Sequence, residues 1–127
     1  MEDQAISALM DRYPATRDVV TACRRFLTSS FPGSSETADL SANVISYSYG
    51  AGYKPLVATL ILGRESVKIG IPYGAAFEDP AGLLEGKGKV HKHVVVDSLQ
   101  DLERPALAAL LAASRDACTS RISIGSS

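Results

Sequence analysis

Glycine, lysine and histidine are concentrated in residues 86–93, which read GKGKVHKH. Glycine lets the backbone approach a ligand closely, and successive backbone N–H groups can form a concave site for an anion. The lysine and histidine side chains supply positive charge, which Lys54 or Lys68 would extend from neighbouring strands. This composition predicts a binding site for a small anion at one end of a sheet. Its residues would be Gly86, Lys87, Gly88, Lys89, Lys92 and His93, with Tyr73 at the rim.

In this interpretation Lys89, Lys92 and His93 contact the anion, while the Gly86 and Gly88 backbone shapes the cradle. The alternative is a solvated loop that uses glycine for its turn and lysine for solubility. The stretch is not a phosphate-binding P-loop, because the required glycine spacing and the Ser or Thr after the lysine are missing.

Two further interpretations involve a metal ion. His91 and His93 lie two residues apart, so they share one face of a strand and could bind a divalent metal with Asp97, Glu78 or Asp79. Alternatively, carboxylates could gather iron weakly, since iron accepts oxygen ligands. These acids are scattered, which is more typical of solvated helix faces: Glu2, Asp3, Asp11, Asp97, Asp101, Glu103 and Asp116. Asp101 is instead expected to form a capping pair with Ser98.

The sequence gives little support for catalysis. It has no Gly-x-Ser-x-Gly motif, and Cys23 and Cys118 lie on the apolar sides of expected helices without a histidine partner. No cofactor is therefore expected. Tyrosines suit a pocket rim, although half-buried strand positions are the favoured explanation for them: Tyr47, Tyr49, Tyr53 and Tyr73.

Hydrophobic periodicity predicts three helices. Ile6, Leu9, Met10 and Tyr13 recur at helical spacing, and Pro14 separates them from a second helix that ends at Phe31. A third helix begins at Pro105, with a stripe at Leu107, Leu110, Leu111, Ser114 and Cys118 and a frayed tail over residues 122–127. One helical turn is expected between Asp79, as its N-cap, and Gly86.

Alternating and continuous apolar runs predict strands at residues 44–49, 55–62, 67–71 and 91–96, the first three as an antiparallel meander. Residues 33–36 are expected to be a loop. Helices at both ends of a run of strands indicate an α+β fold, with an antiparallel sheet of about four or five strands and the helices on one face.

Length and composition fit one ordinary domain spanning residues 1–127. The chain has 46% hydrophobic and 21% charged residues, and 13 basic against 14 acidic side chains give a net charge of −1. This balance argues against a dedicated nucleic-acid binder, and no apolar run is long enough for a membrane span. Two distant cysteines and an acidic start without a signal-peptide pattern predict a cytoplasmic protein.

Residues 74–96 read GAAFEDPAGLLEGKGKVHKHVVV and resemble the signature of the YdhG-like family of small bacterial domains. The matching residues are Asp79-Pro80, Gly82-Leu83-Leu84, Gly86, Gly88-Lys89 and Lys92-His93, and the likeness continues through residues 98–105 as the signature region 74–105. The family usually has arginine where this chain has Lys92, and lysine lacks the planar fork that binds an anion bidentately. The family's frataxin-like label implies a role in handling iron.

These observations lead to two expectations. The first is a cytoplasmic, non-enzymatic domain, as a monomer or homodimer, that binds a small anionic ligand or partner at residues 86–93. The alternative, which the resemblance implies, is a frataxin-like iron-binding chaperone that uses acidic side chains, with or without His93.

Overall fold

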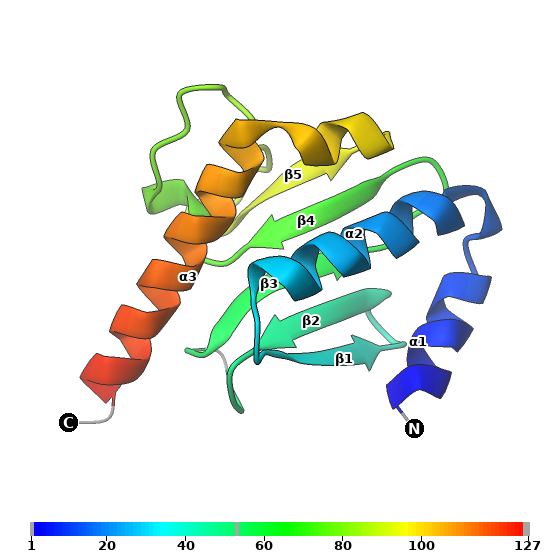
Figure 1. Ribbon diagram of the computed structural model, residues 1–127, viewed down its shortest axis with the longest axis horizontal. Helices are drawn as coiled ribbons and strands as arrows, with labels where there is room; N and C mark the ends of the chain where they lie inside the picture. The colour runs from blue at the N-terminus through cyan, green and yellow to red at the C-terminus, as the bar shows by residue number, and fades with distance from the viewer. Residues whose placement is uncertain (1, 53, 126–127) are drawn as a thin grey trace.

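The chain folds into two layers, with helices packed on one face of an antiparallel sheet (Figure 1). The computed structural model describes residues 2–52 and 54–125. The helices are α1 (Glu2–Asp11), α2 (Arg17–Ser30) and α3 (Pro105–Gly125). The five strands lie side by side in chain order: β1 (Ser35–Asp39), β2 (Val44–Ser48), β3 (Leu56–Ile61), β4 (Val67–Ile71) and β5 (Lys92–Val96). The predicted α+β class is therefore confirmed.

The core lies between the sheet and the stripes of α2 and α3. Val20, Cys23 and Leu27 of α2 are buried. The stripe predicted for α3 is buried along its length, at Leu107, Leu110, Leu111, Ser114 and Cys118. The Ser114 hydroxyl donates a hydrogen bond of 2.7 Å to the carbonyl of Val57, so this polar position joins α3 to β3.

Every strand pairs antiparallel with the next strand along the chain, which confirms the predicted meander and extends it to β5. The connections are short except between β4 and β5, where residues 72–91 intervene. The capping pair at the end of β5 is also confirmed, since the Asp101 carboxylate accepts hydrogen bonds from the backbone N–H groups of Asp97 and Ser98.

Strand β1 corrects the expectation of a loop at residues 33–36. Its side chains alternate between exposed and half-buried, but its two inward positions are Glu36 and Ala38. A polar residue at an inward position removes the apolar alternation that marks a strand in a sequence. The strand forms because β2 supplies its backbone partners over five residue pairs.

The expected helical turn after Asp79 is a hydrogen-bonded reverse turn instead. The Gly82 N–H donates to the carbonyl of Asp79, and Gly82 has a φ of 67° that glycine adopts without strain. The Asp79 carboxylate accepts from the N–H groups of Leu83 and Leu84, so it caps a turn rather than a helix. The helical turn of this region is a 3₁₀ helix at Gly74–Ala76.

Helix α3 continues through Gly125, so the described part of the tail predicted to fray from Ile122 is helical. Residues 126–127 and Tyr53 lie outside the described residues. Within the described part of the chain, none of the helices combines the length and the apolarity that crossing a membrane requires.

Candidate functional site

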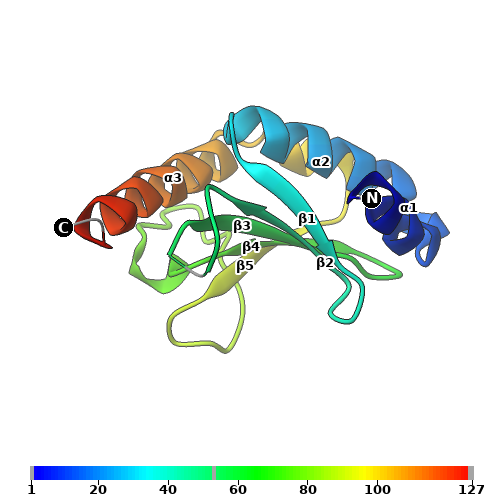
Figure 2. The same cartoon turned by 90° about the horizontal axis from the view of Figure 1, so that it is seen from below.

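The sheet has one face without a helix over it in the described chain. Figure 2 shows α2 and α3 above the sheet, while the loop before β5 and the β1–β2 turn project on the opposite side. Strand register places one row of side chains across this uncovered face: Thr37, Ser46, Thr59, Gly70 and His93. The row is polar or small, in contrast to the buried residues of the helix-covered face.

A hollow of about 200 Å³ lies around Gly70 on the uncovered face. Gly70 is required there, because a Cβ at this position would lie 2.1 Å from the Thr59 hydroxyl oxygen. Missing side-chain volume at the centre of the sheet therefore creates the floor of the hollow. The lining residues are Leu56, Thr59, Ile61, Gly70, Ile71, Pro72, His91, Lys92 and His93.

His93 is held at the wall of this hollow by its backbone and its ring. Glu85 forms an isolated bridge with His93, in which each N–H donates to the other's carbonyl at 2.7 and 3.0 Å. The ring packs against Gly86, where a Cβ would lie 3.2 Å from two ring atoms. Burial and the positive charge of Lys68 lower the pKa of His93 below 6.5, and Glu85 opposes this shift. The imidazole is therefore mainly neutral at pH 7.

Two lysines add positive charge beside His93. The Lys92 ammonium donates a 2.8 Å hydrogen bond to the carbonyl of Gly86, which leaves two of its three N–H groups for other partners. Lys68 lies opposite Ile61 and Val95 in the strand register, two residues from Gly70. Burial is the main cause of the lowered pKa of His93, and the charges of both lysines add to it while that of Glu85 opposes it.

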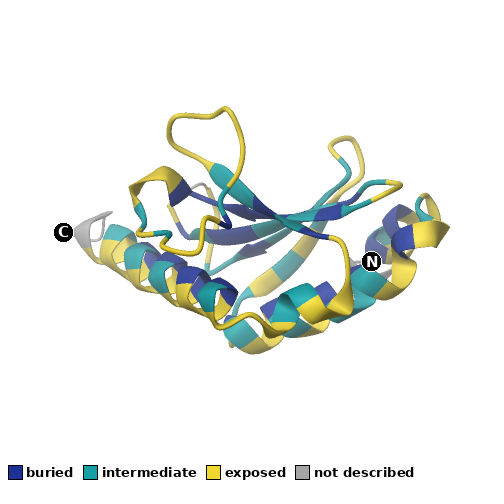
Figure 3. Cartoon of the chain, turned by 90° about the horizontal axis from the view of Figure 1, so that it is seen from above, coloured by how far each residue is buried: buried dark blue, intermediate teal, exposed yellow. Residues whose placement is uncertain are grey.

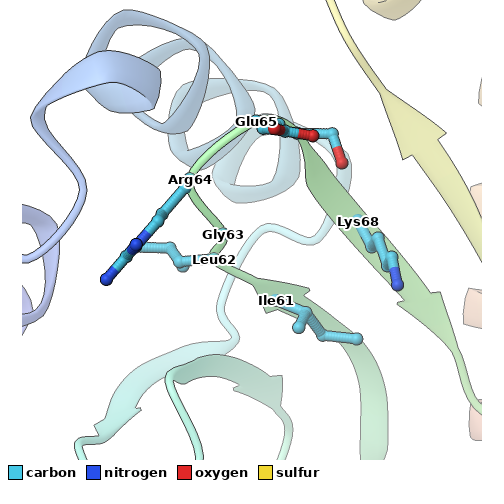
Figure 4. Close-up of a pocket in the computed structure, with 7 residues that line it drawn as sticks. Ile61, Leu62, Gly63, Arg64, Glu65 and Lys68 are labelled. Atoms are coloured by element: carbon cyan, nitrogen blue, oxygen red, sulfur yellow. The ribbon is translucent and has the colours of Figure 1, made fainter.

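The hollow adjoins a second one of about 440 Å³ at the β3–β4 turn. Ile61 lines both, and the second is completed by residues 62–66 and Lys68. In Figure 4 the side chains of Ile61 and Lys68 point to the same side of the sheet, whereas Arg64 points away. Ile61 therefore joins the two hollows, and Lys68 lines the second.

His91 is engaged with Tyr73 at the other end of the first hollow. The Tyr73 N–H donates 3.0 Å to His91 Nδ1, so the neutral ring carries its proton on Nε2. The two rings meet edge to face at 5.1 Å, and the Arg121 guanidinium lies 4.4 Å from the Tyr73 ring centre. Tyr73 is thus part of a packed group and not a mobile rim.

The structure brings together only part of the predicted anion site. Lys92 and His93 line the hollow, but Lys87 and Lys89 are exposed in the loop before β5, which projects from the sheet (Figure 3). Gly88 allows a close backbone approach within that loop, because a Cβ at this position would lie 2.8 Å from the His91 carbonyl oxygen. The close approaches of Gly86 and Gly88 are therefore made to the chain itself.

Sequence reasoning missed the floor of the site. Thr59, Gly70 and His93 belong to three different strands. They become neighbours only because β3 pairs with β4 and β4 pairs with β5. An isolated glycine inside the apolar run 67–71 was the one available signal, because such a residue often marks a close approach.

In the described part of the chain, the acids and histidines of the two metal hypotheses do not gather into a cluster of metal ligands. Among residues 2–52 and 54–125, no three His, Cys, Asp or Glu side chains are placed to hold a metal ion. Asp97 follows the far end of β5, roughly 13 Å along an extended chain from His93. Asp101 accepts the capping hydrogen bonds described above.

The cysteines and Tyr47 are structural. Burial raises the pKa of Cys23 to about 12 and also raises that of Cys118, so neither is an available thiolate at neutral pH. Tyr47 is buried, not half-buried, and its hydroxyl donates to Glu36 at 2.5 Å.

Comparison of the chain with protein-family models, curated proteins and solved structures finds no match.

Proposed function

We propose that this protein binds a small oxyanion, a phosphate or carboxylate group, in the hollow around Gly70. The observation that carries the proposal is a hollow on the uncovered sheet face that Lys92 and His93 line, with Lys68 close enough to His93 to lower its pKa. Positive potential at a concave surface concentrates anions there, even on a chain whose net charge is −1.

The chemistry of the lining suits an oxyanion. Each ammonium offers several N–H donors, and neutral imidazole offers one. The Thr59 hydroxyl adds a donor from the floor, and Leu56 and Ile61 contribute apolar surface to the lining. Hydrogen bonds from charged donors are the stronger kind, so the two lysines would supply most of the affinity.

The proposal is one of binding, because the residues that line the hollow supply donors for an anion. We also propose, from the signature region 74–105 alone, that the chain is YdhG-like, and that it is cytoplasmic, a location that two buried free cysteines support. We favour an anion over iron as the ligand because the acids near His93 do not gather into a cluster.

Titration calorimetry with phosphate and pyrophosphate tests this function. Replacing Lys68 with glutamine removes one charged donor, worth about 1.5–3 kcal/mol, so Kd should rise roughly tenfold or more. The matched control is Lys89→Gln, which removes the same charge from the exposed loop and should change Kd less than about twofold. Equal losses in both variants would contradict the hollow as the site, and the absence of any binding would contradict the function.

A further inference from the structure

A separate cavity lies on the helix side of the molecule, where the end of β2 and the turn after α2 meet the C-terminal half of α3. Its volume is about 280 Å³. The described residues that line it are Pro32, Tyr49, Arg115, Thr119, Ile122 and Ser123. None of them lines the hollow around Gly70, so the two cavities are independent.

The Tyr49 hydroxyl is the unusual group in this cavity. Its oxygen is buried, and among residues 2–52 and 54–125 it has no hydrogen-bond partner. Buried polar groups are nearly always paired, because an unpaired one loses its bonds to water without replacement. Because Tyr49 itself lines the cavity, we expect a ligand that enters it and displaces the atoms covering the hydroxyl to supply the missing partner.

Arg115 gives the cavity a positive charge. It is an exposed residue of α3 and forms no ion pair with the acids of the described chain. Burial raises the pKa of Tyr49, and the nearby charge of Arg115 opposes this rise. A guanidinium and a hydroxyl at one cavity are the donors that recognise a carboxylate.

From this geometry we infer a second ligand site, which takes a small carboxylic acid with a compact apolar body. The carboxylate accepts hydrogen bonds from the Tyr49 hydroxyl and the Arg115 guanidinium. Pro32, Ile122 and the Thr119 methyl group contact the apolar part. The volume is close to the lower end of the range of small-molecule sites, so it fits an acid about the size of benzoate rather than a nucleotide.

Benzoate is the probe for the binding test, measured by calorimetry on the full chain. Tyr49→Phe removes only the hydroxyl and Arg115→Gln removes only the charge, and each should weaken benzoate binding at least about fivefold. Arg25→Gln, an exposed arginine of α2, is the matched control and should leave Kd unchanged. Benzyl alcohol, which lacks the carboxylate, should bind wild type and Arg115→Gln equally weakly.

Two further measurements keep the result interpretable. The melting temperature of Tyr49→Phe without ligand should equal or exceed that of the wild type, because the lost hydroxyl has no partner to leave behind. Lys68→Gln should not change benzoate affinity, which separates this site from the proposed oxyanion site. Absence of saturable benzoate binding by the wild type would overturn the inference. So would wild-type benzoate affinity in both Tyr49→Phe and Arg115→Gln, or loss of benzoate binding in Lys68→Gln.

Discussion

At the scale of single residues, one ion pair explains how a polar strand joins the sheet. Glu36 of β1 faces inward and accepts two hydrogen bonds from the Arg24 guanidinium, at 3.0 and 2.8 Å. The Tyr47 hydroxyl donates a third to the same carboxylate. Burial raises the pKa of Glu36, but the hydrogen bonds from Arg24 and Tyr47 outweigh it and leave the pKa lowered. The ionised carboxylate therefore stabilises the fold.

Replacing Glu36 with glutamine should destabilise the protein by roughly 1–3 kcal/mol at pH 7, because Arg24 and Tyr47 lose a charged acceptor in a partly buried place. A lowered pKa means that this stabilisation is present above the ordinary pKa of 4.5 and is lost as the pH falls through the lowered value. The difference between wild type and variant in urea unfolding should therefore shrink at pH 3. Asp11→Asn, which breaks the exposed pair with Arg17, should cost less than about 1 kcal/mol.

At the scale of elements, hydrophobic periodicity predicted the helices and strands that pack against the core. It did not predict the features that depend on pairing between strands. The stripe from Leu107 to Cys118 and the alternation at residues 67–71 are local patterns, and both elements formed as expected. Strand β1 and the floor of the hollow depend on partners far along the chain, so no local pattern reveals them. For the same reason the sequence pointed to Lys92 and His93 but also to Lys89, which the loop carries away from the sheet.

The contact between β3 and β4 at the hollow yields a prediction of its own. Gly70→Ala places a Cβ 2.1 Å from the Thr59 hydroxyl oxygen, so it should destabilise the fold by about 1–3 kcal/mol. Removing the hydroxyl should relieve the clash, because the Cβ of Thr59 would then be the nearest atom of that residue, at 3.5 Å. Urea unfolding of Thr59→Ala/Gly70→Ala should recover most of the loss. Additive losses in the double variant would show that the clash is not the cause.

At the scale of the whole molecule, the two layers divide structure from proposed function. The helices bury one face of the sheet, and the loop before β5 and the β1–β2 turn project from the other side (Figures 2 and 3). With a net charge of −1, the chain has little long-range attraction for anions, so binding must rely on charges gathered locally. Protonation of His93 would add one such charge to the hollow.

Coupling between that protonation and anion binding gives the last prediction. Because the pKa of His93 is lowered, the ring is mainly neutral at pH 7.5 and gains charge as the pH falls through the lowered value. Sulfate, which stays doubly charged over this range, should bind more tightly at pH 5.5 and raise the melting temperature more there. A tenfold tighter Kd adds about 1.4 kcal/mol at saturation, or roughly 3–6 °C for a domain of this size. In His93→Gln the sulfate effect should depend less on pH than in the wild type, although His91 also lines the hollow. Exclusion of sulfate from the surface acts on both proteins, so only the difference between them reports binding. The same pH dependence in wild type and variant would place the titrating group elsewhere.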